Sequence, residues 1–112
     1  MSSEPTWHST TILAVKKGRK LVVMAVHDSG WRDALALHEA GVNIAAIVDL
    51  RRDIDPALVE AARSARIGCY TGYAVTKVTG RQAVTGVKIA LDGIAKEQAL
   101  ECDGVLMAGG WT

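Results

Sequence analysis

Apolar and polar positions along the chain alternate in a way that predicts strands and helices in turn. Residues 21–26 form a continuous apolar run with three valines, which is typical of a strand covered on both faces. Residues 31–40 carry their apolar side chains on one stripe and most charged ones outside it, which predicts an amphipathic helix. Gly41 stands where a left-handed residue ends such a helix, and residues 42–48 predict a second buried strand.

The next segment predicts a second helix and a third strand. Asp55 and Pro56 form a strong helix start, because the carboxylate can accept hydrogen bonds from the first amides and the fixed φ of proline suits the first helical position. We expect this helix to run to about residue 65, although Arg66 occupies the place where glycine is the usual cap. Residues 67–70 then predict the strand.

Beyond this strand the period of the pattern changes from about 3.6 to 2. Residues 74–79 and 83–90 alternate on either side of a polar turn, which predicts a hairpin, and residues 98–102 predict a third antiparallel strand. Residues 103–108 are again largely apolar and predict a final buried strand.

This order predicts an α/β fold: a Rossmann-like three-layer parallel sheet (β-α-β-α-β) with an antiparallel β-meander insertion and a final parallel strand. We expect residues 1–19 to be a flexible N-terminal segment, in which residues 10–15 could add one short strand, and residues 16–20 to be an exposed basic turn. Residues 20–112 are expected to form one nucleotide-binding-type domain. Because a strand that ends in paired glycines should lead into a loop and a helix, we expect a fragment truncated at its C-terminal edge.

Charge and composition narrow the classes of partner. The net charge is +1, from 13 basic and 12 acidic side chains, so no strong field exists that would attract nucleic acid or an anionic membrane. No apolar run approaches the roughly 20 residues that span a bilayer, and the N-terminus lacks the features of a secretion signal. We therefore expect a cytoplasmic protein that binds neither nucleic acid nor membrane.

No catalytic or metal site is predicted. Cys69 and Cys102 lie 33 positions apart without a CxxC motif or a paired histidine, so two buried thiols are the favoured interpretation. The adjacent His27, Asp28 and Ser29 do not predict a hydrolase triad, because consecutive residues of a turn point in different directions.

The turn after the first strand resembles a phosphate-binding turn with most of its glycines replaced. In a Rossmann unit one glycine allows the tight turn, a second lets the backbone approach the pyrophosphate, and a third allows close packing of helix on strand. Ala25, His27 and Gly30 occupy these places. We expect the His27 imidazole to exclude phosphate, whereas the helix start behind Ser29 and Gly30 still offers amides that could form a weak anion site.

Asp49 is the candidate for holding a ribose. It ends the second strand 24 positions after Ala25, where an acid of this fold can bind both ribose hydroxyls and favours NAD over NADP. The alternative is a solvated charge network of Asp49 with Arg51, Arg52 and Asp53 at the end of the strand. The candidate cofactor-binding residues are therefore His27, Ser29, Gly30, Asp49, Gly109 and Gly110.

Three segments carry a resemblance to a known family. The stretches HDSGWRDALALHEAGV (residues 27–42), NIAAIVDLRRD (residues 43–53) and ECDGVLMAGGWT (residues 101–112) resemble the alpha subunit of heterotetrameric sarcosine oxidase. The likeness covers about residues 20–112. It implies a bacterial flavoenzyme that oxidatively demethylates sarcosine to glycine, reduces oxygen to hydrogen peroxide and passes the one-carbon unit to tetrahydrofolate.

The resemblance also implies where the cofactors lie. NAD would be bound by the parent enzyme, and FAD or FMN and tetrahydrofolate would be held by other parts of the complex and not by this piece. The domain itself would be a degenerate dinucleotide-binding domain that is inactive in isolation and contacts other domains and subunits of a hetero-oligomeric oxidase. Two alternatives remain: a working NAD-binding module of another flavoprotein oxidoreductase, and a non-catalytic interaction domain that uses residues 74–90.

Overall fold

Four parallel strands form the central sheet of the computed structural model, which describes residues 20–91, 93–94 and 96–108. The strands are β1 (Lys20–Ala25), β2 (Asn43–Asp49), β3 (Gly68–Thr71) and β7 (Gly104–Ala108). Their order in the sheet is β3-β2-β1-β7. The predicted Rossmann-like α/β fold is thus confirmed, whereas the expectations for residues 1–19 and for Gly109 and Gly110 lie outside the described residues.

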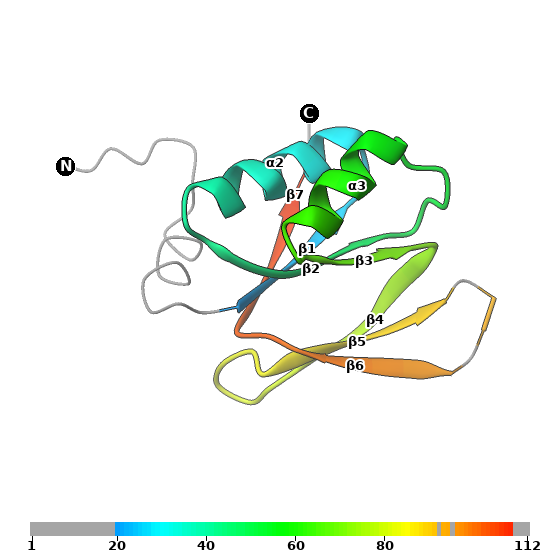
Figure 1. Cartoon of the computed structure of the whole chain (residues 1–112). Coiled ribbons are helices and arrows are strands. Elements are labelled where there is room, and N and C mark those ends of the chain that lie inside the picture. Colours follow the sequence, from blue (N-terminus) through cyan, green and yellow to red (C-terminus); the bar gives the residue numbers. More distant parts are fainter. Residues whose placement is uncertain (1–19, 92, 95, 109–112) are drawn as a thin grey trace.

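Helices α2 (Asp28–Glu39) and α3 (Pro56–Ser64) cover one face of this sheet (Figure 1). The start of α3 is as predicted: the Asp55 side chain accepts a 3.0 Å hydrogen bond from the amide of Ala57. The start of α2 was predicted too late. Its N-cap is His27, whose backbone is extended at φ −142° and ψ 165°, so the residues predicted as a turn form the first helical turn.

Both helices end with a residue in the left-handed region. Gly41 has φ 99°, and the amide of Val42 donates to the carbonyl of Leu37 over 2.9 Å. The same arrangement ends α3, where Arg66 has φ 64° and the amide of Ile67 donates to the carbonyl of Ala62 over 3.0 Å. As predicted, α3 has no glycine cap. Arg66 takes the place of the glycine and adopts the left-handed conformation that glycine favours.

A three-stranded antiparallel sheet covers the opposite face (Figure 1). It consists of β4 (Tyr73–Thr79), β5 (Gly86–Leu91) and β6 (Glu97–Glu101) in that order, which confirms the predicted meander. Only Gly72, with φ 79°, separates β3 from β4. The amide of Gly72 donates to the carbonyls of Asp49 and Arg51 over 2.7 and 3.0 Å.

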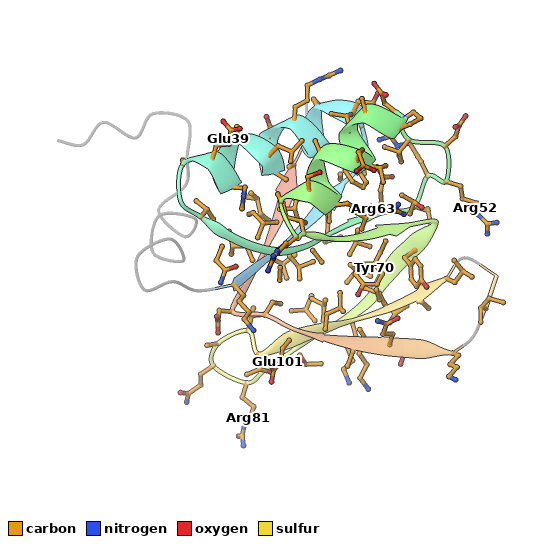
Figure 2. All side chains as sticks on the ribbon, viewed as in Figure 1. Glu39, Arg52, Arg63, Tyr70, Arg81 and Glu101 are labelled. Atoms are coloured by element: carbon orange, nitrogen blue, oxygen red, sulfur yellow. The ribbon has the colours of Figure 1, made fainter. Side chains whose placement is uncertain are left out.

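The parallel sheet separates two apolar cores. One lies between the sheet and the helices and includes Val23, Trp31 and Ile47, with Cys69 packed against it. The other lies between the two sheets and includes Val22, Val48, Val87, Ile89 and Cys102. Tyr70 lies between the two sheets and meets the ring of Tyr73 edge to face, with ring centres 5.3 Å apart (Figure 2). Among the described residues no helix is long and apolar enough to cross a membrane.

Candidate functional site

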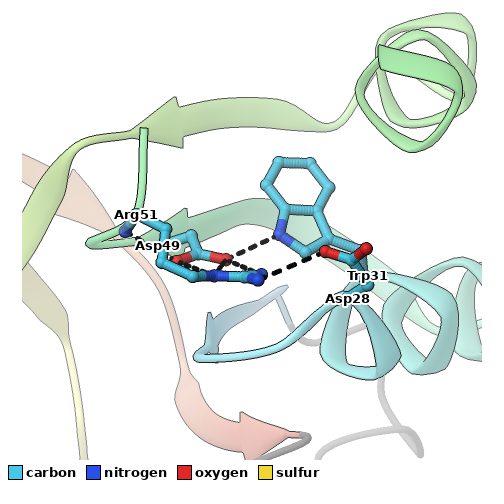
Figure 3. Close-up of polar contacts among 4 residues, drawn as sticks. All are labelled: Asp28, Trp31, Asp49 and Arg51. Carbon is cyan, nitrogen blue, oxygen red and sulfur yellow. Dashed lines mark hydrogen bonds and ion pairs between the residues drawn. The ribbon is translucent and has the colours of Figure 1, made fainter. Parts of the chain in front are cut away.

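The carboxylate of Asp49 lies at the carboxyl end of β2, on the face covered by the helices. Its residue is only 1% exposed to solvent. The indole nitrogen of Trp31, in the first turn of α2, donates a 2.9 Å hydrogen bond to Oδ2 of this carboxylate (Figure 3). A buried tryptophan N–H needs an acceptor, and a buried carboxylate needs donors. The two side chains therefore satisfy one another inside the core.

Arg51 provides the remaining donors to Asp49 (Figure 3). Its Nε lies 3.2 and 3.3 Å from the two carboxylate oxygens, its Nη2 lies 2.7 Å from Oδ2, and its backbone amide donates to Oδ1 over 2.9 Å. The guanidinium also forms an ion pair of 3.3 Å with Asp28 in the first turn of α2. The hydrogen bond with Asp49 and the nearby carboxylates raise the pKa of Arg51.

These contacts correct the prediction of a solvated charge network at this strand end. The network forms with Arg51, but its central carboxylate is buried, because Trp31 covers it from the side of α2. Sequence reasoning placed Trp31 on the apolar stripe of the helix and missed its hydrogen bond. Asp28 was likewise missed as the second acid that holds Arg51. The signal available was the general need of a buried indole N–H for an acceptor.

Gly30 retains the packing role of the third Rossmann glycine. It is buried in the first turn of α2, and a Cβ added there would lie 2.6 Å from the carbonyl oxygen of Ala108 and 2.8 Å from the Cβ of Ala25. Real Cβ atoms almost never approach so closely. The helix can therefore lie against β1 and β7 only because residue 30 has no side chain.

His27 and Ser29 are exposed at the start of α2. The side chain of His27 makes no capping hydrogen bond, while its carbonyl accepts from the amide of Gly30 over 3.0 Å. The first amides of the helix thus have no side-chain cap from His27, and the hydrogen bonds of the Asp49 carboxylate go to Trp31 and Arg51 and not to His27 or Ser29. Gly109 and Gly110, the remaining predicted candidates, lie outside the described residues.

The two cysteines do not form a redox pair. Cys102 is buried in the core between the sheets, and Cys69 is half-buried on the helix side of the parallel sheet. Burial raises the pKa of both thiols, which keeps them protonated and poorly reactive near neutral pH. In the part of the chain that the structure describes, no group of three His, Cys, Asp or Glu side chains could hold a metal ion.

An exposed apolar strip follows the carboxyl ends of β1 and β2 on the face of the antiparallel sheet. A hollow of about 210 Å³ is lined by Met24, Ala25, Val26, Val48, Leu50, Tyr73, Ala74 and Val75. A second hollow of about 300 Å³ shares Tyr73 and is lined by Leu91 and Ile94 together with the polar side chains of Lys96, Glu97 and Gln98. Val26, Leu50 and Ile94 are 41%, 54% and 51% exposed. We call the apolar residues of these two hollows the apolar strip.

Comparison with known proteins places the fold. No family model and no curated protein sequence match the chain. The thioredoxin reductase of T. acidophilum is similar in structure with a TM-score of 0.74 and 26% sequence identity, over 93% of this chain and 35% of that protein. The thioredoxin reductase of Giardia duodenalis is similar with a TM-score of 0.68 and 20% identity, over 87% of this chain and 32% of that protein.

A third similar structure is the histamine dehydrogenase of Rhizobium sp. 4-9, with a TM-score of 0.67 and 20% identity over 85% of this chain and 15% of that protein. The chain spans about a third of the length of the thioredoxin reductases. It therefore has the Rossmann-like, FAD/NAD-binding type of fold that forms one part of these oxidoreductases.

Proposed function

We propose that the chain is a domain of a larger oxidoreductase subunit of the sarcosine oxidase alpha type, in which it has a structural role. Its likeness to that subunit over residues 20–112 supports the choice of enzyme. Its structural likeness to parts of larger oxidoreductases supports the choice of a domain within a longer chain. The isolated chain is expected to have no oxidase activity, because no catalytic group is assembled among its described residues.

The observation that supports the structural role is that the carboxylate of Asp49 is buried and already hydrogen-bonded within the domain. A carboxylate that binds the two hydroxyls of a ribose needs free acceptor positions at the surface. Both oxygens of Asp49 instead accept from Trp31 and Arg51, and the residue is buried. Nucleotide binding would have to displace Arg51 and expose a carboxylate whose burial is compensated by these donors.

The imidazole of His27 adds a second obstacle. It stands in the place of the glycine that allows the pyrophosphate to approach the first amides of the helix. In the parent enzyme, NAD, a flavin (FAD or FMN) and tetrahydrofolate would accordingly be held by other segments, and sarcosine would be oxidised there. Disulfide reduction is not proposed, because the two cysteines of this chain lie in different cores.

Titration of the full chain with NAD, followed by amide chemical shifts and by calorimetry, tests this proposal. We expect no saturable shifts at Asp28–Gly30 or Asp49 and no measurable heat of binding. Saturable shifts confined to these residues would instead favour the alternative of a working NAD-binding module. The uncapped first turn of α2 is the observation that keeps this alternative worth testing.

The apolar strip favours a second candidate function, a non-catalytic interaction domain. Exposed apolar patches on a domain surface often mark contacts with other proteins or domains. If the chain belongs to a subunit of the sarcosine oxidase alpha type, such partners would be the other domains and subunits of that hetero-oligomeric oxidase. Leu50→Ser in the full-length parent subunit should weaken assembly without changing the fold of this domain. Unchanged assembly of the variant, measured by analytical ultracentrifugation, would count against the strip as the contact surface.

A further inference from the structure

The two methionines among the described residues lie side by side. Met24 of β1 and Met107 of β7 are partners in the parallel register, so their side chains leave the same face of the sheet about 4.8 Å apart. Val22 and Val105, the partners two positions earlier, pack toward the core between the two sheets. Because side chains alternate along a strand, the two thioethers lie on that face as well.

The antiparallel sheet covers this face only in part. Val22 is fully buried against it, whereas Met107 is 53% exposed. Met24 is half-buried. It lies between Met107 on one side and Val48 on the other, and it lines the hollow of about 210 Å³ in the apolar strip. The pair therefore has an outer member, Met107, and an inner member, Met24.

Met107 is the most exposed sulfur-containing side chain of the residues that the structure describes. Peroxides oxidise a thioether to a sulfoxide, and exposure to solvent favours the reaction. The thiols of Cys69 and Cys102 are more buried, and burial raises the pKa of both, so that they stay protonated and react slowly near neutral pH. Among these side chains, the first to meet a peroxide in solution is Met107.

We propose that Met107 and Met24 form a two-step oxidation site for hydrogen peroxide or an organic hydroperoxide. The sulfur of Met107 attacks one peroxide oxygen, so that an S–O bond forms while the O–O bond breaks. Sulfur supplies two electrons, and the proton of the transferred oxygen passes to the other oxygen, which leaves as water or an alcohol. Met24 reacts second by the same chemistry, because the side chain of Met107 shields it.

The second step changes the polarity of the apolar strip. The sulfoxide of Met107 stays at the surface, where water solvates it. The sulfoxide of Met24 places a polar oxygen against Val26, Leu50 and Tyr73, which line the same hollow. Such a change weakens apolar contacts and can be reversed by methionine sulfoxide reductases. An effect on assembly rests on the second candidate function above, whereas the oxidation itself does not.

Oxidation of the full chain by excess hydrogen peroxide at neutral pH, followed by mass spectrometry of its peptides, tests the two steps. Met107 should be oxidised about fivefold or more faster than Met24 in the folded chain, and the two rates should become similar in urea. Met107→Ala should raise the rate of Met24 about threefold, because it removes the shielding side chain. Met107→Leu retains the bulk of that side chain and is the matched control, in which the Met24 rate should not change.

Equal rates of Met24 and Met107 in the folded chain would overturn the proposed order of oxidation. A Met24 rate that is the same in Met107→Ala and Met107→Leu would overturn the shielding. Amide NMR of the oxidised chain should show shifts at Val26 and Leu50 that follow the oxidation of Met24, and their absence would overturn the effect on the apolar strip. None of these measurements involves NAD, so their failure is distinct from failure of the proposed function.

Discussion

The indole of Trp31 and the carboxylate of Asp49 are joined by a 2.9 Å hydrogen bond within the apolar core. The bond ties the first turn of α2 to the end of β2, two elements that would flank the ribose of a bound dinucleotide in this type of fold. The hydrogen bond thus helps to hold these two elements together.

Trp31→Phe should destabilise the protein by about 1.5–3 kcal/mol, the usual range for a hydrogen bond to a charged group. A smaller aromatic ring replaces the buried indole, so Asp49 loses its indole donor and some packing is lost as well. Chemical denaturation with urea measures the effect, and a double-mutant cycle with Asp49→Asn separates the bond from the loss of packing. A cycle with no coupling between the two positions would contradict the role assigned to this bond.

If the imidazole obstructs the site as proposed, His27→Gly should create weak nucleotide binding that the unaltered chain is expected to lack. The change removes the imidazole from the path by which a phosphate would reach the uncapped first amides of α2. The Asp49 carboxylate would still be hydrogen-bonded to Arg51. Arg51→Ala combined with His27→Gly should bind more tightly, since it also frees an oxygen of Asp49. Calorimetric titration with NAD measures both effects.

Arg63→Ala combined with His27→Gly is the matched control for this pair, because it removes an equal charge from an exposed position on α3. It should bind NAD no more tightly than His27→Gly alone. If the unaltered chain bound NAD and His27→Gly weakened that binding, His27 would be a ligand and the proposed obstruction would be wrong.

Gly30→Ala should cost about 1–3 kcal/mol of stability, the range found when extra atoms are forced into a packed core. The added Cβ would collide with the Ala108 carbonyl and the Ala25 side chain, so α2 would have to move away from the sheet. Ser29→Ala, at the exposed neighbouring position, serves as the control and should change stability little. Thermal and urea denaturation of both variants distinguish a packing effect from a change in helix propensity.

Arg66→Gly should stabilise the protein by about 0.5–1 kcal/mol. The left-handed conformation costs a residue with a side chain about 1–2 kcal/mol, and part of this gain is lost to the greater freedom of glycine in the unfolded chain. Gly41→Ala makes the reverse change at the end of α2 and should destabilise by about 1 kcal/mol. Changes of equal sign in the two variants would contradict this explanation of the helix ends.

Stability should fall at alkaline pH because of the buried thiols. Burial raises the pKa of Cys102 in the folded protein, so above about pH 8.5, the ordinary thiol value, the unfolded chain releases the proton more readily. The free energy of unfolding is therefore unaffected by this group at lower pH and declines as the pH rises through that range. Urea denaturation at pH 7 to 10 should show a shallower alkaline decline in Cys102→Ala than in the unaltered chain.

The fold was predictable from the sequence, because the change from helical to alternating periodicity separates the two sheets. The burial and hydrogen bonding of Asp49 were not predictable. They depend on Trp31, which is 18 positions away along the chain and resembles any apolar residue on the buried face of an amphipathic helix. The early start of α2 was missed because His27 gives none of the side-chain signals of a helix cap. Residues that act locally, such as Asp55, were recognised, whereas those that act through tertiary contacts were not.

Gly72 connects the parallel sheet directly to the antiparallel sheet. It is the only residue between β3 and β4, and its amide is clamped by the carbonyls of Asp49 and Arg51. A Cβ at this position would meet the Arg52 side chain at 2.9 Å. A displacement of β4 would therefore act directly, through these two backbone hydrogen bonds, on the residues around the Asp49 carboxylate.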